Sequence, residues 1–336
     1  MMCASFDLSV VISSYNRDNK VLETLRHLFR SDFSALGKVE VIIVDDGSPL
    51  PVENVLPRLG GVPDEVELKV ITQERSGVGA TRNKGFRASR ASIVLFLDDD
   101  ILVERDTLNK IVESHRGNQR AVVFGSYPFV SHSSDALHRF ASRLFDYGTS
   151  AKEEYEPVHA ITSGLLSVNK RLLSSIERLY KDDLTTPAAE EYEIIHRLYR
   201  LQVPIFRAKH IRALHNHHLN LAWLAQQQYK YGLGTAEAFC KYPEIVALDK
   251  FSGLKSKLDC IGRKDVRGMI KLALASRIGR ETIFWAARML ERLFPSGNHS
   301  LVFGLLTSSF YWAGYLEGVK RFATKGDGSG DVCLLS

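Results

Sequence analysis

The sequence predicts an α/β protein with a mostly parallel sheet flanked by helices, followed by a helical C-terminal region. In the first 125 residues, short apolar runs alternate with segments of helical spacing. These runs are apolar almost throughout, which is typical of parallel strands covered by helices on both faces. From residue 219 onward, helical spacing dominates the sequence. The chain is therefore expected to join a sheet domain to a set of helices.

Each element can be placed in order. The first four strands are expected at Leu8–Ser13, Val39–Val44, Glu67–Thr72 and Ser92–Leu97, and two more at Ala121–Gly125 and Gly164–Val168. Helices are expected at Val21–Phe29, Ala80–Ala88, Ala136–Phe145, Glu190–Arg200, Leu221–Tyr231, Lys264–Ser276, Glu281–Leu293 and Leu301–Lys320. Residues 126–160 form a long polar and aromatic connection, which favours a functional loop or flap. We expect a catalytic domain at 1–218, with halves at about 1–105 and 106–218, then helices at 219–323 and a flexible tail at 324–336.

Composition narrows the function. The chain of 336 residues is 45% apolar and 25% charged, which excludes disordered and fibrous proteins. Its net charge of +5 is too small to indicate a nucleic-acid partner. The four cysteines lie far apart, which indicates a reducing compartment. No basic segment precedes the first strand, so no signal peptide is expected. We therefore predict a cytoplasmic location.

Acidic residues follow two of the predicted strands. Asp45-Asp46 follows the second strand and Asp98-Asp99-Asp100 the fourth. Because ligands of open α/β sheets bind beyond the carboxyl ends of the strands, both groups are candidates for a site. Like charges so close repel unless a cation or hydrogen-bond donors offset them. Asp45-Asp46 can equally form a turn or a helix cap. Three consecutive acids, as in Asp98–Asp100, suit a divalent cation.

A glycine-rich segment, Ser76–Gly85, lies between these acids and begins a helix. It lacks the third glycine of a dinucleotide fingerprint, because Arg82 stands there. A loop at a helix N-terminus still suits phosphate, and Arg82 can add charge-assisted hydrogen bonds. The alternative is an ordinary loop with a solvated arginine.

Four motifs in this order resemble the family 2 glycosyltransferases, which have a Rossmann-type GT-A fold. They are Val10–Arg17, Val41–Ser48, Gly79–Gly85 (the family's AxRNxG segment) and Phe96–Asp100 (its DxD metal motif). A weaker resemblance continues in Gly164–Val168 with Arg171, in Glu190–Glu193 with Arg197-Leu198, in Val203–Ile205 and in Ala213–His215. The Glu190–Glu193 segment resembles the one that supplies the catalytic base. Glu191 stands where the family usually has aspartate, so the base is Glu191 or Glu190.

The resemblance implies an inverting transfer of a sugar from a nucleoside-diphosphate sugar to the hydroxyl of a glycan, lipid-linked or protein acceptor. It implies a role in glycan, polysaccharide or glycolipid assembly. It also implies Mn²⁺ or Mg²⁺ held by Asp98, Asp100 and His215. The implied nucleotide-sugar residues are Ser13, Tyr15, Arg17, Asp46, Arg82, Asn83, Asp98 and Asp99, with Arg82 on the diphosphate and Asp46 on the base.

Two other hypotheses stay open. A nucleotidyltransferase also joins a nucleotide-binding sheet to metal-binding acids, but it would have a glycine-rich basic loop where this chain has Ser13–Arg17. A non-catalytic nucleotide-sugar-binding protein could share the fold, and Glu191 is compatible with a lost base. The run of His210, His215, His217 and His218 could be ordinary histidines or a zinc site, but no cysteine or second histidine pair lies nearby, which favours ordinary histidines.

The C-terminal helices suggest peripheral contact with the inner face of a membrane. Residues 255–292 hold ten Lys or Arg against four Asp or Glu, with aromatic residues among them. The alternative is a solvated basic face. Leu301–Leu316 has no charged residue, but its 16 residues are fewer than the ~20 that a span needs. The final Cys333–Ser336 fits a prenylation box or a chance match.

Overall fold

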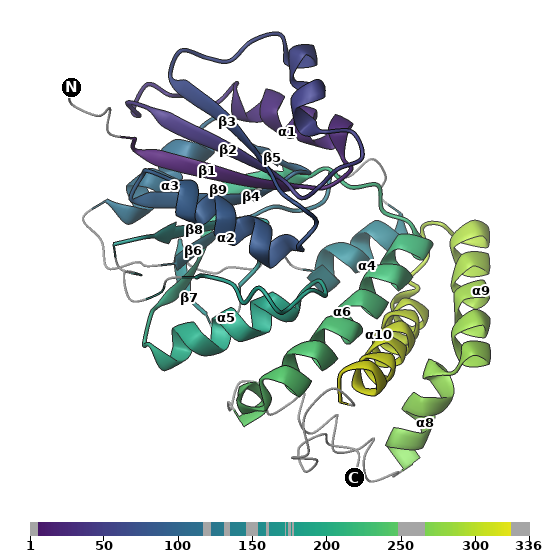
Figure 1. The fold of residues 1–336 in the computed structure, drawn as a ribbon. Helices are drawn as coiled ribbons and strands as arrows, with labels where there is room; N and C mark the ends of the chain where they lie inside the picture. Colours follow the sequence, from purple (N-terminus) through teal and green to yellow (C-terminus); the bar gives the residue numbers. More distant parts are fainter. Residues whose placement is uncertain are drawn as a thin grey trace. The chain divides into compact units, whose positions relative to one another are not determined.

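The computed structural model describes residues 6–116, 122–130, 135–145, 154–158, 161–171, 173, 176, 178–247 and 266–323 (Figure 1). The chain divides into two compact units. The first comprises Met1–Val130, Asp146–Asp182 and Arg197–His217, and the second Ser131–Phe145, Asp183–His196 and His218–Ser336. The predicted tail 324–336 with its Cys333–Ser336 end, parts of the 126–160 connection and residues 255–265 lie outside the described residues.

The first unit is built on a mixed sheet. Its strand order is β3-β2-β1-β4-β8-β6-β9-β5, with β7 paired to β9. The strands are β1 (Leu8–Ser14), β2 (Val39–Asp45), β3 (Val66–Thr72), β4 (Ile93–Asp98), β5 (Ile101–Val103), β6 (Val122–Ser126), β7 (Tyr155–Pro157), β8 (Leu165–Asn169) and β9 (Ile205–His215). Strands β1 to β4 are parallel, β6 is parallel to β9, and β8 runs antiparallel between β4 and β6. The predicted α/β class with a mostly parallel sheet is confirmed.

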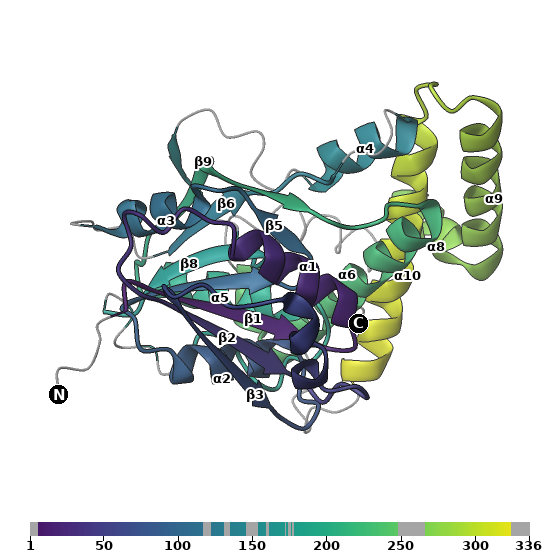
Figure 2. The ribbon, with the colours of Figure 1, turned by 90° about the horizontal axis from the view of Figure 1, so that it is seen from above.

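Helices cover both faces of the parallel strands. Alternate residues Leu8, Val10 and Ile12 of β1 join a core with α1 (Asp18–Leu28) and α3 (Thr107–His115). Val11 points to the other face, where a Cβ on Gly85 of α2 (Val78–Ala88) would lie 2.2 Å from Val11 Cγ1. Figure 2 shows α1 and α2 on opposite sides of these strands. Strand β1 is therefore apolar on both sides, which explains its continuous apolar sequence.

The end of β9 brings distant segments of the chain together. The strand pairs with β6 at Ile205 and with β5 at His215, opposite Ile101. Because β5 begins three residues after β4 ends, this register sets the Asp98–Asp100 turn beside the end of β9. The short strands β5 and β7 and the full length of β9 were not predicted, because their residues lack a long apolar run.

The second unit is helical. It contains α4 (Ala136–Phe145), the first part of α5 (Ala189–Arg200), α6 (Leu221–Lys241), α8 (Val266–Ala275), α9 (Arg277–Leu293) and α10 (Ser300–Phe322). Helices α6 and α10 pack closely, since a Cβ on Gly232 or Gly314 would lie 1.9 or 2.0 Å from a carbonyl oxygen of the other helix. Within the described ranges, no helix has a stretch long and apolar enough to cross a membrane. The predicted helices are present, and α6 runs ten residues beyond its predicted end.

Short 3₁₀ turns complete the described elements. They are η1 (Val52–Asn54), η2 (Leu56–Leu59) and η3 (Pro243–Ala247). The first two follow β2, where the Asp45 carboxylate accepts hydrogen bonds from the backbone N–H groups of Ser48 and Val52. Asp45 therefore shapes the turn after its strand, as expected for an Asp-Gly turn.

Candidate active site

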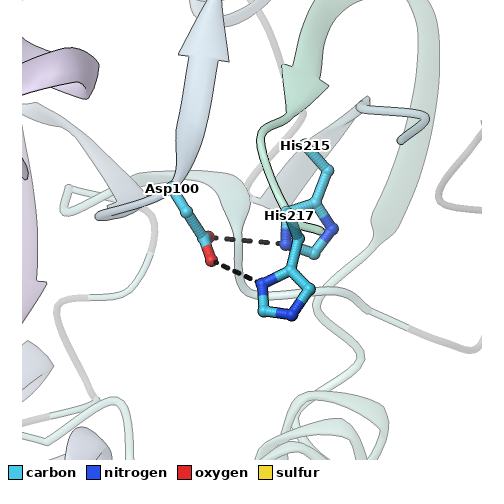
Figure 3. A group of neighbouring side chains, drawn as sticks. All are labelled: Asp100, His215 and His217. Atoms are coloured by element: carbon cyan, nitrogen blue, oxygen red, sulfur yellow. Dashed lines mark ion pairs between the residues drawn. The ribbon is translucent and has the colours of Figure 1, made fainter. Parts of the chain in front are cut away.

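Three side chains with metal-ligating atoms meet at the carboxyl edge of the sheet. Asp100, His215 and His217 each offer one ligand atom, and these atoms lie within 4.8 Å of one another (Figure 3). His215 Nε2 is 3.4 Å from Asp100 Oδ1, and His217 Nδ1 is 3.6 Å from Asp100 Oδ2. One carboxylate and two imidazoles form a donor set that fits a divalent cation, since both groups are common metal ligands in proteins.

The His215 ring is held from several sides. It stacks on Phe129 with ring centroids 4.8 Å apart and meets the edge of Tyr127 at 6.0 Å. The backbone N–H of His215 donates to the Pro128 carbonyl, and the Asn216 N–H donates to the Asp100 carbonyl at 2.8 Å. These contacts fix both Asp100 and His215 before any ligand binds, which is the preorganisation a metal site needs.

Arg17 bridges the two buried acids of the turn. Its Nη1 lies 2.9 Å from Asp99 Oδ1 and 2.8 Å from Asp100 Oδ2, and the Ser14 hydroxyl donates to Asp99 Oδ2. Burial opposes the charge of Arg17, but the two carboxylates outweigh it and raise the pKa of the guanidinium. Arg17 thus acts as an internal cation within the acidic turn.

Asp99 and Asp100 differ in their proton affinity. Burial raises the pKa of Asp99 to about 7, against the lowering effect of Arg17. Burial would also raise the pKa of Asp100, but hydrogen bonds with His215 and His217 and the charge of Arg17 hold it well below its usual range. Asp100 is therefore the ionised carboxylate of the pair, which is the state a metal ligand needs.

Asp98 lies outside the three-residue group and pairs with Arg82 instead. Arg82 belongs to the first turns of α2, and its Nη2 lies 2.8 Å from Asp98 Oδ1. The Arg82 side chain is buried and lies over the Tyr180 ring at 5.3 Å, whereas 39% of the Asp98 side chain is exposed. Arg82 is thus not solvated, and its charge is directed to the end of β4.

The other predicted nucleotide-binding residues have distinct surroundings. Asp46 accepts from the backbone N–H groups of Ser76 and Gly77, so it holds the loop that enters α2, where Gly77 has φ +92°. The Tyr15 hydroxyl accepts from Arg75, whose guanidinium lies 4.0 Å from the centre of the Tyr15 ring. Among the described residues, the buried Ser13 hydroxyl has no hydrogen-bond partner.

Asn83 is fully buried within the first unit. Its amide donates to the Tyr180 carbonyl at 2.6 Å and to Asp182 at 2.7 Å, and its oxygen accepts from the Tyr180 N–H. These bonds fix the segment that carries Tyr180, which in turn lies against Arg82. Asn83 therefore has the surroundings of a residue that positions the site.

The candidate bases lie in the second unit, in the first turn of α5. Glu190 and Glu193 are buried, and Glu191 is half-buried. Positions 190 and 193 lie close together on one face, and 191 points about 100° away from 190. The adjacent Tyr192 hydroxyl accepts a hydrogen bond from Thr235, and burial raises the pKa of Tyr192.

His217 is the site residue that sequence analysis left unassigned. It belonged to the histidine run, and its spacing of two from His215 is the signal that could have identified it. In an extended segment, residues two apart lie on the same side. The carboxylate that joins the two rings comes from a turn more than a hundred residues earlier, which is why spacing within the run was insufficient.

Comparison with known proteins now decides the family. The glycosyl transferase family 2 model matches residues 9–176, half of the chain, and this range contains the acidic turn and Arg82. The chain belongs to glycosyl transferase family 2. This membership favours the glycosyltransferase hypothesis over nucleotidyl transfer.

Curated relatives match the first part of the chain. It is 29% identical over 123 residues to the putative glycosyltransferase EpsH of Bacillus subtilis, covering 36% of this chain and 33% of the relative. It is 34% identical over 118 residues to the validoxylamine A glucosyltransferase of Streptomyces hygroscopicus subsp. limoneus, covering 34% of this chain and 25% of the relative. The chain therefore spans a third or less of the length of these two relatives.

Solved structures share the fold. The mannosyltransferase PcManGT from Pyrobaculum calidifontis, in complex with GDP-Man and Mn²⁺, has a TM-score of 0.65 at 15% identity, covering 95% of this chain and 88% of that one. GalNAc-T7 with UDP, GalNAc and Mn²⁺ has a TM-score of 0.51 at 16% identity, covering 73% and 52%. These likenesses confirm the predicted GT-A fold.

Proposed function

We propose that this protein transfers a sugar from a nucleoside-diphosphate sugar to an acceptor hydroxyl, with inversion at the anomeric carbon and with a divalent cation. The observation that carries the proposal is the Asp100, His215 and His217 group at the carboxyl edge of the sheet. Family membership supports the transfer reaction, and the nucleotide-sugar and Mn²⁺ in PcManGT support this donor class.

Asp100, His215 and His217 would hold Mn²⁺ or Mg²⁺, with the two imidazoles favouring Mn²⁺. When bound, the cation would offset the negative charge that develops on the leaving diphosphate. Arg82 would serve the same charge from the start of α2 and would then exchange its partner Asp98 for phosphate oxygens. Asp98 and Asp99 complete the polar edge beside the ribose.

The nucleoside would lie over the ends of β1 and β2. The Ser13 hydroxyl offers a hydrogen bond, and the paired Tyr15 and Arg75 offer a flat surface. Asp46 contributes through the loop of Ser76 and Gly77 that it holds. Asn83 holds the backbone of Tyr180, and the Tyr180 ring in turn positions Arg82.

Glu191 is the proposed base, with Glu190 as the alternative. The carboxylate takes the proton of the acceptor hydroxyl while that oxygen bonds to the anomeric carbon. In the same step the bond from that carbon to the diphosphate oxygen breaks, and the nucleoside diphosphate leaves with the bonding electrons. A single displacement of this kind inverts the anomeric centre.

The acceptor is a hydroxyl of a glycan, a lipid-linked sugar or a protein. The chain is 26% identical over 133 residues to the putative teichuronic acid biosynthesis glycosyltransferase TuaG of Bacillus subtilis, which supports a role in polysaccharide assembly. A cytoplasmic location with peripheral contact to the inner face of the membrane is part of the proposal.

The test measures nucleoside diphosphate released from a panel of nucleotide sugars, without acceptor and then with candidate acceptors. Activity should disappear with a chelator and return with Mn²⁺. Glu191→Gln should nearly abolish transfer while donor binding persists, since glutamine keeps the shape but cannot accept the proton. If only Glu190→Gln is inactive, the base is Glu190. Full activity of both variants, or full activity after chelation, would refute the mechanism.

A further inference from the structure

Exposed apolar side chains gather on the C-terminal helices. Ten of the sixteen large apolar side chains that are exposed among the described residues lie between residues 269 and 305. They are Met269, Ile270, Leu272, Ile278, Trp285, Met289, Leu293, Phe294, Leu301 and Leu305. Single exposed apolar residues are normal, but such a concentration marks an interaction surface.

Helix α9 has two apolar faces. Its inner face buries Ile283 and Ala287, and α9 contacts α10 and α8 within the second unit (Figure 1). Its outer face carries Ile278, Trp285, Met289 and Leu293, which are 79%, 60%, 51% and 59% exposed. At 100° per residue these four positions fall within about 80° of the helix circumference. They therefore form one continuous stripe, where an ordinary surface helix would be polar.

Basic residues border this stripe. Arg288 and Arg292 lie along one edge, and the Arg288 guanidinium lies 5.5 Å from the centre of the Trp285 ring. Residues 266–305 hold six Lys or Arg against two Asp or Glu. The stripe of Ile278, Trp285, Met289 and Leu293, with Arg288 and Arg292, is called the α9 outer face below.

We propose that the α9 outer face docks on an anionic lipid bilayer, with the helix lying in the plane of the interface. Its apolar stripe would enter the boundary between headgroups and acyl chains. Trp285 suits that boundary because its ring is apolar and its N–H is polar. Arg288 and Arg292 can reach lipid phosphates while their aliphatic stems cover apolar surface.

Charge favours lipid over a second copy of this chain. A second copy of this chain would bring the same surplus of basic residues to the contact, and like charges repel. An anionic surface instead complements them. The inference deepens the membrane contact of the proposed function, and it brings the enzyme to the surface where lipid-linked acceptors reside.

Flotation of the full chain with vesicles tests the docking, in the absence of any nucleotide sugar. The probes are vesicles of phosphatidylcholine alone and vesicles that also contain phosphatidylglycerol. We expect binding to the anionic vesicles, weakened by high salt because surface charges are screened. Arg288→Gln with Arg292→Gln should weaken binding about 30-fold, the effect of two basic residues near an anionic surface. The control, Arg30→Gln at an exposed position in the turn after α1, should bind as the wild type does.

Trp285 supplies a direct spectroscopic readout. The chain has three tryptophans, and Trp312 is buried while Trp285 is exposed. Its emission should shift to shorter wavelength with anionic vesicles, and Trp285→Phe should lose the shift while the protein still floats. Trp285→Ser with Met289→Ser should reduce flotation, whereas Leu50→Ser, an exposed apolar residue of the first unit, should not.

Three results would overturn the proposal. They are absence of binding, equal binding to both vesicle types at all salt concentrations, and a dimer in light scattering that Trp285→Ser with Met289→Ser dissociates. The last would assign the α9 outer face to a second copy. Sugar transfer is measured separately with water-soluble acceptors. A failure to bind vesicles therefore leaves the proposed reaction intact, and a failure of sugar transfer leaves the membrane docking intact.

Discussion

Two buried acidic sites lie at opposite ends of the parallel strands, and they differ in how their charge is satisfied. At the amino end, Glu40 of β2 accepts from the Ser9 hydroxyl at 2.7 Å and from the backbone N–H and Nε of Arg90 at 2.9 and 2.7 Å. At the carboxyl end, Asp99 and Asp100 share Arg17. Both ends thus bury carboxylates, but only the carboxyl end sets two adjacent carboxylates against one guanidinium.

The difference indicates which site is structural and which is functional. Glu40 has three donors on two oxygens and links β1, β2 and the segment before β4. At the other end, burial raises the pKa of Asp99 to about 7, and two imidazoles adjoin Asp100. Clustered ionisable groups with perturbed pKa values are a mark of functional sites. A satisfied buried acid stabilises the fold, whereas an under-neutralised group can bind a cation.

The largest effect should come from Asp100→Asn. Removing the charged member of the three-residue group should lower sugar transfer at least ~100-fold, as loss of a key electrostatic group does in other enzymes. Mn²⁺ binding, followed by the electron paramagnetic resonance of the free ion, should weaken in parallel. The melting temperature should fall, because the lowered pKa of Asp100 means that its ionised form stabilises the fold. Transfer and Mn²⁺ binding are therefore compared per folded molecule. Normal transfer by this variant would remove Asp100 from the mechanism.

Glu40→Gln is the matched variant at the opposite end. The amide cannot accept from three donors with the same strength, so unfolding by urea should show a loss of about 1–3 kcal/mol. Transfer per folded molecule and Mn²⁺ affinity should equal the wild-type values. A selective loss of transfer with unchanged stability would contradict the division between structural and functional acids.

Arg17→Met tests whether the internal cation competes with the metal. A divalent cation on Asp100 must displace or tolerate the Arg17 guanidinium, so its removal should tighten Mn²⁺ binding about tenfold. Without Mn²⁺ the variant should melt at a lower temperature, because Asp99 and Asp100 lose their shared counter-charge. Arg30→Met serves as the control. Weaker Mn²⁺ binding by Arg17→Met would mean that Arg17 orients Asp100 for the metal.

The smallest effect concerns another buried acid, Glu237 of α6 in the second unit. Burial opposes its charge, but hydrogen bonds from Thr186 and Lys241 outweigh this and lower its pKa below the ordinary 4.5. A lowered folded pKa means that the stabilisation is complete above pH 4.5 and is lost as the pH falls below it. Glu237→Gln should therefore melt at a lower temperature than the wild type at neutral pH, and this difference in melting temperature should become smaller in acid. A difference in melting temperature that grows in acid would contradict the lowered pKa of Glu237.

Much of the first unit could be predicted from local patterns. Strands β1 and β2 are buried on both faces, so their continuous apolar runs predicted them. The acidic residues and Arg82 could then be assigned to the carboxyl edge of the sheet. Strands β5 and β7 have three residues each and could not be recognised, because so short a run carries no periodicity. The helical spacing of α9 predicts a helix, but it does not show that the helix has two apolar faces or which of them is buried.

The sequence by itself determined the family, the order of elements and the residues that carry charge at the strand ends. Only the tertiary structure decided which of these charges meet. The register of β5 on β9 joins Asp100 to His215 and His217, while Asp98 turns to Arg82. The physical reason is that strand pairing over more than a hundred residues sets these contacts, and no local spacing encodes it.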